Sequence, residues 1–105
     1  MHGYYYDPLH GNCLRRIRRI DMYTYTIDGV YGNDEPNTHG AWTAIVRVTE
    51  FHEGGALNMS VDFKGKPIKK NRFMTATYDP KSRVVHWHED GNMWRQLYFS
   101  AFMLS

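Results

Sequence analysis

Residues Leu57 to Lys64, LNMSVDFK, alternate strictly between apolar and polar side chains. The apolar side chains stand at every second position, beginning with Leu57 and ending with Phe63. Successive side chains of a β-strand point to opposite faces, so a strand through this stretch has one apolar and one polar face. The stretch therefore predicts a β-strand that buries one face and exposes the other.

The same period of two recurs in three other parts of the chain. It is clear over 23–28, 42–49 and 84–89, where β-branched and aromatic residues are frequent. Turn-forming residues separate these stretches, and Asp90-Gly91-Asn92 predicts a hairpin between Arg83–Glu89 and Met93–Phe99. The sequence therefore predicts seven or eight short antiparallel strands joined in sequence order.

A meander of this kind has two exposed edges unless the sheet closes on itself. We therefore expect an all-β fold in the form of a small barrel, closed or half open, with a two-sheet sandwich as the alternative. The 105 residues suffice for a single domain over 1–105, and 42% of them are hydrophobic, which is enough for a core. In so short a barrel, side chains fill the interior and leave at most a small pocket.

Composition and motifs weigh against several classes of protein. No apolar run approaches the ~20 residues of a membrane span, and the first residues lack the pattern of a signal peptide, so we expect no membrane association. The single cysteine, Cys13, cannot form an internal disulfide, which favours a cytoplasmic location. No phosphate-binding loop or nucleophile motif occurs, so we expect no cofactor and treat catalysis as the minority interpretation.

The segment Leu14 to Ile20, LRRIRRI, carries four arginines in seven residues. In a strand, either Arg15 and Arg19 or Arg16 and Arg18 point the same way as the core. A buried guanidinium must be paired, because an isolated charge is strongly unfavourable in a medium of low dielectric constant. The favoured interpretation is a bulged or edge strand whose arginines pair with acidic residues of neighbouring strands. The candidate partners are Asp28, Asp62 and Glu50.

A second interpretation places an unpaired arginine inside the barrel, where it would hold a ligand. The leading function is then a small non-catalytic binding or interaction domain, with a small anionic or aromatic ligand in an apolar pocket. This interpretation requires an inward arginine without a carboxylate partner. The candidate ligand-binding residues are Arg15, Arg16, Arg18, Arg19, Tyr25, Trp42 and Trp87.

A third interpretation is binding of single-stranded nucleic acid by a basic, tyrosine-rich surface. Stacking side chains beside a basic groove are the usual combination in such proteins. The interpretation requires that the four arginines share one face with a second basic cluster, formed by Lys64, Lys66, Lys69, Lys70 and Arg72. The tyrosines that could stack on bases are Tyr4, Tyr5, Tyr6, Tyr23 and Tyr25.

His86 and His88 are two positions apart, which places both imidazoles on one face of a strand. This spacing can chelate a metal ion, and a metal-dependent enzyme is the second alternative function. A third ligand would have to come from His10, His39 or His52. The favoured interpretation is two surface or half-buried histidines without a metal, because metal sites need converging ligands.

The tripeptide Gly40-Ala41-Trp42 resembles the Gly-x-Trp motif that opens many lipocalin and fatty-acid-binding-like barrels. The resemblance covers three residues and one arginine. It implies a barrel in which an arginine stacks on the tryptophan, and Arg95 near the C-terminus is the candidate for this role.

The segment Leu97 to Leu104, LYFSAFML, is apolar almost throughout but does not alternate. It is too short to span a bilayer. We expect it to dock as the final strand of the sheet, and the alternative is that it forms the interface of a homo-oligomer.

Overall fold

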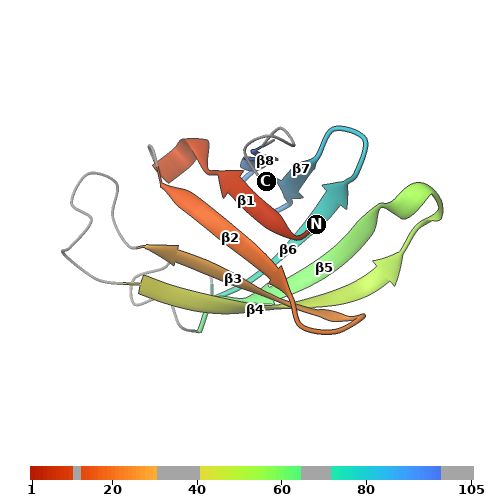
Figure 1. Ribbon diagram of the computed structural model, residues 1–105, viewed down its shortest axis with the longest axis horizontal. Coiled ribbons are helices and arrows are strands. Elements are labelled where there is room, and N and C mark those ends of the chain that lie inside the picture. The colour runs from red at the N-terminus through yellow and green to blue at the C-terminus, as the bar shows by residue number, and fades with distance from the viewer. Residues whose placement is uncertain (11–12, 31–40, 65–71, 98–105) are drawn as a thin grey trace, which may run out of the picture.

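The structure is a computed structural model that describes residues 1–10, 13–30, 41–64 and 72–97 (Figure 1). These residues form β-strands and two short 3-10 helices, η1 (Pro8–His10) and η2 (Glu53–Gly55). The strands are β1 (Gly3–Tyr6), β2 (Leu14–Arg19), β3 (Thr24–Val30), β4 (Ala41–Phe51), β5 (Leu57–Asp62), β6 (Phe73–Asp79), β7 (Val84–Trp87) and β8 (Met93–Gln96).

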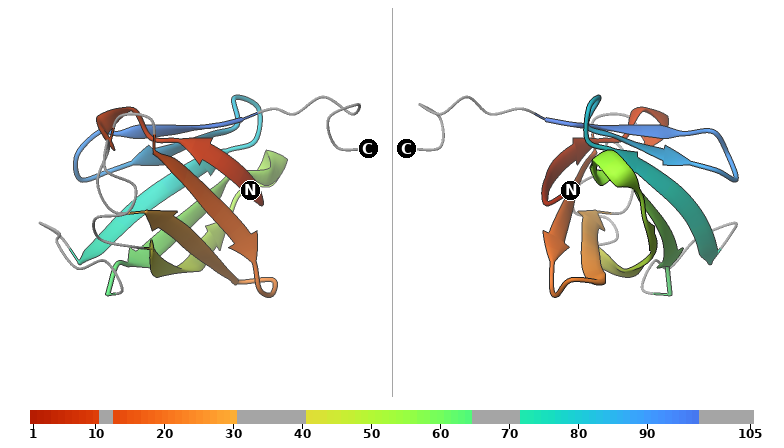
Figure 2. Two further views of the ribbon diagram at one scale, coloured as in Figure 1. Left: turned by 60° about the vertical axis from the view of Figure 1, so that its left-hand side comes forward. Right: turned by 90° about the vertical axis from the view of Figure 1, so that its right-hand side faces the viewer.

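The eight strands form one closed antiparallel barrel. Each strand pairs with the next along the chain, and β8 pairs with β1. Figure 2 shows the strands wrapping around a common interior. The closing pair is short: Tyr5 lies opposite Gln96, Tyr6 lies opposite Arg95, and the Leu97 N–H donates a hydrogen bond to the Tyr4 carbonyl oxygen at 2.8 Å. The predicted all-β meander and its closure are confirmed, and the sandwich alternative is wrong.

The core follows the alternation of the sequence. In β5 and just beyond it, all four apolar positions from Leu57 to Phe63 are buried, as are the alternate positions of β4 from Trp42 to Val48. The buried hydrophobic cluster draws residues from every strand of the barrel. Its members are Tyr5, Ile17, Tyr25, Ile27, Trp42, Ala44, Val46, Val48, Leu57, Met59, Val61, Phe63, Ala76, Tyr78, Val85, Trp87 and Trp94.

Because neighbouring strands are antiparallel, the connections alternate between the two ends of the barrel. Asp7, which follows β1, and the β7–β8 connection lie at one end, which we call the Asp7 end. Met1 and the β2–β3 turn lie at the other end, which we call the Met1 end. This assignment decides which interior side chains meet.

The predicted hairpin of β7 and β8 forms, but its turn is longer than the two-residue type that Asp90-Gly91 favours. His86 lies opposite Met93, and the connection between the strands spans residues 88–92. Gly91 has a φ of 70°, whereas Asp90 lacks the positive φ that a type I′ turn requires. The longer turn lets the Asn92 side chain reach the barrel interior, where it is buried.

Several expectations fall outside the described residues. The predicted loop Gly32 to Gly40 is one of them, apart from its boundary with β4. The apolar segment beyond Leu97 is another, so its docking as a strand and its role in a homo-oligomer stay predictions.

Candidate functional site

Arg15 lies inside the barrel and is paired. Along β2, Arg15 and Ile17 face inward and are buried, so the register is the one that turns Arg15 rather than Arg16 and Arg18 inward. Arg15 is 2% exposed, and its Nη2 lies 3.4 Å from Oδ2 of Asp7, which is also buried. An inward arginine that already has a carboxylate partner does not meet the requirement of the anionic-ligand interpretation.

Asn92 completes this buried polar group. Its Nδ2 donates to Asp7 Oδ1 at 2.9 Å, and its own Oδ1 accepts a hydrogen bond from the Met93 N–H at 2.9 Å. The Leu9 N–H donates to Asp7 Oδ1 at 3.1 Å. Asp7, Arg15 and Asn92, which we call the buried triad, thus join β2 and the segments that follow β1 and precede β8.

Four aromatic side chains at the same end of the barrel pack against one another and against Arg15. Ring centroids are 5.8 Å apart for Trp42 and Phe63, 5.6 Å for Phe63 and Trp87, and 4.9 Å for Trp87 and Trp94. The Arg15 guanidinium lies 5.1 Å from the Trp42 ring and 6.0 Å from the Trp94 ring. Each of the four aromatic side chains thus contacts the next, and Arg15 contacts both the first and the last. We call Trp42, Phe63, Trp87 and Trp94 the interior aromatic cluster.

The arginine over Trp42 is Arg15, so the assignment of Arg95 to this role is wrong. Trp94 faces the core, and its neighbour Arg95 must therefore point to the outer surface, where it is exposed. The Gly-x-Trp resemblance implies the correct kind of contact but the wrong partner. Arg15 lies on β2 and Trp42 on β4, and these strands both pair with β3, so the two side chains meet across the barrel interior.

Tyr25 is buried as expected, but it lies towards the Met1 end with Tyr5 and Tyr78. The Tyr5 hydroxyl donates to the Met1 carbonyl oxygen, and the Tyr78 hydroxyl donates to Gln96 Oε1 at 3.1 Å. Burial raises the pKa of the Tyr5 and Tyr78 hydroxyls, so both stay protonated at neutral pH. The structure thus gathers Arg15, Trp42 and Trp87 at one end of the barrel and leaves Tyr25 nearer the other.

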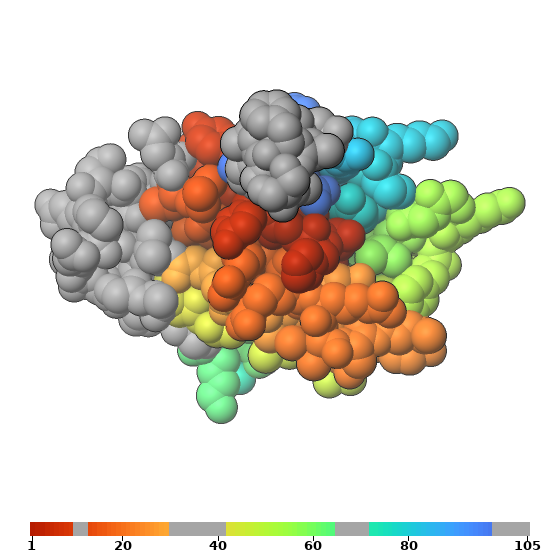
Figure 3. Space-filling model, in the orientation of Figure 1, coloured from red at the N-terminus to blue at the C-terminus, as the bar shows by residue number. Residues whose placement is uncertain are grey.

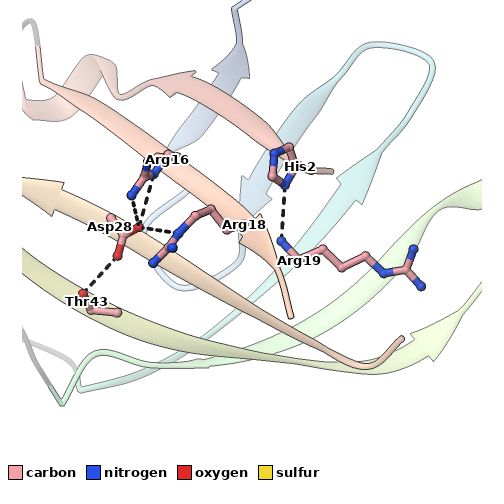
Figure 4. Close-up of polar contacts among 6 residues, drawn as sticks. All are labelled: His2, Arg16, Arg18, Arg19, Asp28 and Thr43. Carbon is pink, nitrogen blue, oxygen red and sulfur yellow. Dashed lines mark hydrogen bonds and ion pairs between the residues drawn. The ribbon is translucent and has the colours of Figure 1, made fainter. Parts of the chain in front are cut away.

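Arg16 and Arg18 point outward and share one carboxylate (Figure 4). Arg16 Nη2 lies 3.1 Å and Arg18 Nε 2.9 Å from Asp28 Oδ2, and the Thr43 hydroxyl donates to Asp28 Oδ1 at 3.0 Å. Partial burial would raise the pKa of Asp28, but hydrogen bonds from Thr43 and the two arginines together hold it below its ordinary value. These pairs confirm the predicted ion pairing with Asp28. The expected bulged or edge strand is wrong, because β2 pairs with β1 and β3 without a register shift. Arg19 is exposed at the end of β2, and its Nε donates to the Asp21 carbonyl oxygen at 3.2 Å.

The outer surface of β8, β1 and β2 combines aromatic, apolar and basic side chains. Tyr6 lies between Leu14 and Arg95 in one cross-strand row, and Tyr4 lies opposite Arg16 in the next. Figure 3 looks onto β1 and β2, in red and orange. We call this surface the tyrosine–arginine face; its exposed members are Tyr4, Tyr6, Leu14, Arg16, Arg18, Met93 and Arg95.

The two described members of the second basic cluster do not share this face. Lys64 and Arg72 flank the β5–β6 connection, and in an eight-stranded barrel these strands lie across from β1 and β2. Arg72 is also paired, with its Nε 2.9 Å from Asp62 Oδ1. Lys66, Lys69 and Lys70 lie outside the described residues. Among the predicted tyrosines, Tyr5 and Tyr25 face the core and Tyr23 lies on the β2–β3 turn, which leaves Tyr4 and Tyr6 on the face.

His86 and His88 both lie on the outer surface of the barrel. The two ring nitrogens of His88 contact the hydroxyls of Thr75 at 2.9 Å and Thr77 at 2.7 Å. His52 lies elsewhere, beside Glu50 on the β4–β5 connection. In the described part of the chain, no three His, Cys, Asp or Glu side chains converge to hold a metal ion. The side chains of His10 and His39 lie outside it.

Comparisons of the chain with protein-family models, curated proteins and solved structures returned no significant match. Among the described residues, no helix is both long and apolar enough to cross a membrane.

Four residues of the Asp7 end are absent from the candidate site residues of the sequence: Asp7, Phe63, Asn92 and Trp94. Asp7 and Asn92 lie in turns, where Asp and Asn usually serve local hydrogen bonds, and no periodic pattern marks them as buried. Phe63 and Trp94 were easier to predict. Phe63 is an apolar position of the alternating stretch that begins at Leu57, and Trp94 lies between Met93 and Arg95 in the predicted final strand.

Proposed function

We propose that the protein is a non-catalytic binding domain whose tyrosine–arginine face binds single-stranded nucleic acid. The observation that carries this proposal is the placement of Tyr4 and Tyr6 on the outer side of β1, between arginines of β2 and β8. The proposal replaces the two-cluster surface expected from the sequence with a smaller one, in which Arg95 takes the place of the lysines.

The two tyrosines have the spacing that base stacking needs. Residues two positions apart on a strand stand roughly 7 Å apart on the same face. Tyr4 is 42% and Tyr6 38% exposed. Sheets that recognise single strands stack two or three bases on exposed aromatic rings in this way, and every base has a ring face that can stack.

The charges of the face favour a polyanion. Arg16 and Arg18 share the single carboxylate of Asp28, so this group keeps a net positive charge. The Arg95 side chain forms no hydrogen bond or ion pair with any described residue. Guanidinium groups bind phosphate in a bidentate geometry that lysine cannot reproduce.

Fluorescence anisotropy with labelled oligothymidine and oligouridine, measured over a range of salt concentrations, tests the proposal. Three phosphate contacts predict that the logarithm of the association constant falls against the logarithm of salt with a slope of about −2. Tyr4→Ala or Tyr6→Ala should weaken binding by roughly tenfold, the effect of one stacked base.

Matched controls lie on other parts of the surface. Tyr23→Ala removes a tyrosine that is also exposed but lies on the β2–β3 turn, and it should leave the affinity unchanged. Arg95→Gln should weaken binding and make the salt slope shallower, whereas Arg47→Gln on β4 should do neither. Equal losses for Tyr4→Ala and Tyr23→Ala, equal affinity for heparin and oligothymidine, or no binding at low salt would each contradict the proposal.

A further inference from the structure

Two buried indole groups at the Asp7 end have no hydrogen-bond acceptor in the part of the chain that the structure describes. Trp87 is 3% and Trp94 4% exposed, and the Nε1 atom of each is buried and donates to no atom of the described residues. A buried tryptophan N–H usually finds a partner, because leaving a buried donor unsatisfied is costly. Two such donors in neighbouring side chains indicate that an acceptor from outside the described residues belongs here.

The surroundings of the two donors select a planar partner. The Trp87 and Trp94 rings meet edge to face with centroids 4.9 Å apart, and Phe63 lies 5.6 Å from Trp87 on its other side. Aromatic rings prefer edge-to-face or offset contacts with further aromatic rings. A molecule that accepts from these indoles is therefore surrounded mainly by ring faces and ring edges.

The charge balance of the same region selects a neutral partner. The Arg15 guanidinium is already paired with the Asp7 carboxylate, and both groups are buried. An added anion or cation would carry an unbalanced charge into a region of low dielectric constant, which is strongly unfavourable.

We infer that the interior aromatic cluster is a binding site for a neutral, planar aromatic molecule that carries a hydrogen-bond acceptor, which the indole N–H groups of Trp87 and Trp94 bind. The site is separate from the tyrosine–arginine face, because it lies inside the barrel and the face lies outside. It does not depend on the proposed function. The inference also replaces the anionic ligand expected from the sequence with a neutral one.

Nuclear magnetic resonance of the nitrogen-15-labelled full chain tests this inference directly. The chain has 3 tryptophans, so its spectrum contains few indole N–H signals, and Trp87→Phe and Trp94→Phe assign two of them. The probes are coumarin, which is neutral and has a carbonyl acceptor, naphthalene, which has none, and 2-naphthoate, which is anionic. Coumarin should shift the signals of Trp87 and Trp94. It should also bind roughly fivefold more tightly than naphthalene, because it gains about one hydrogen bond. 2-Naphthoate should bind least well.

Two kinds of variant separate this site from general changes in the barrel. Trp94→Phe removes the N–H and keeps an aromatic ring, so it should weaken coumarin binding. Tyr78→Phe removes a buried hydroxyl towards the Met1 end and should not change it. Tyr4→Ala, on the outer face, should also leave coumarin binding unchanged, and this distinguishes a failure here from a failure of the nucleic-acid proposal.

Three results would overturn the inference. One is magnetisation transfer from water to the two indole N–H groups without any response to coumarin, which would show that buried water alone satisfies them. Another is equal affinity for coumarin and naphthalene, which would leave the indole N–H groups without a role. The last is preferential binding of 2-naphthoate. The two affinity comparisons are measured on the unmodified protein, so they hold even where a tryptophan variant fails to fold.

Discussion

Arg15 and Arg16 are adjacent on β2 and carry the same side chain, but they lie on opposite sides of the barrel wall. Arg15 is buried with Asp7 and Asn92, whereas Arg16 is exposed and shares Asp28 with Arg18. Each group contains an aspartate and a neutral polar partner, with one arginine inside the barrel and two outside. Inside the barrel the pairing is obligatory, because water cannot replace a lost partner; outside, water can.

Replacing Arg15 should have the largest effect on stability. Arg15→Met leaves the Asp7 carboxylate buried without its cation, which we expect to lower the free energy of unfolding by about 3–5 kcal/mol. The matched change one residue later, Arg16→Met, should lower it by less than about 1 kcal/mol, because its ion pair is exposed. Urea unfolding of both variants measures the difference.

A double variant sharpens this comparison. Combining Arg15→Met with Asp7→Asn removes both charges and keeps an acceptor for Asn92 and the Leu9 N–H. It should recover most of the lost stability, since buried ion pairs are often replaceable by neutral groups. Equal destabilisation by Arg15→Met and Arg16→Met would mean that the Asp7 end is open to water.

Replacing Asn92 should have the next largest effect. Asn92→Ala removes a buried hydrogen bond to the Asp7 carboxylate, and bonds to charged groups contribute about 1.5–3 kcal/mol. Asn58→Ala is the matched control on the outside, because Asn58 Nδ2 donates to the exposed Glu50 carboxylate at 2.8 Å. Thermal unfolding should show a clear loss for Asn92→Ala and a small one for Asn58→Ala; the reverse order would contradict the buried triad.

Replacing Asp28 should have the smallest effect, and this effect should depend on pH. The pKa of Asp28 is lower in the folded state than in the unfolded chain, so its ionised form stabilises the protein above the unfolded pKa, near 4. That contribution disappears as the pH falls through the lower, folded pKa. Asp28→Asn should therefore cost at most about 1 kcal/mol at neutral pH and progressively less in acid. A difference from the original protein that grows in acid would contradict this assignment.

The strands were predictable because their pattern is local. The alternation from Leu57 to Phe63 identifies β5 and its buried face without reference to the rest of the chain. The same holds for Trp42 and Trp87, which both face the core as their strand patterns indicate. The hairpin of β7 and β8 was predictable as a hairpin, but its turn type was not, because Asn92 is drawn inward by a carboxylate that lies 85 residues away.

The candidate site was predictable only in part. The alternation of side chains along β2 allows either Arg15 and Arg19 or Arg16 and Arg18 to face inward. The choice of Arg15 depends on contacts with Asp7, Trp42 and Trp94, which come from three other segments. Tyr25 was correctly expected to face inward, but nothing local shows that it lies towards the opposite end from Trp87.

The sequence by itself determined that this chain forms short antiparallel strands and which apolar side chains of its alternating stretches line the core, because side-chain alternation needs only neighbouring residues. Tertiary structure decided the rest: the closure of β1 on β8, the partner of each arginine and the gathering of aromatic side chains at the Asp7 end. These features depend on contacts between distant segments. The free-energy cost of a buried charge or of an unsatisfied donor likewise depends on the groups that surround it.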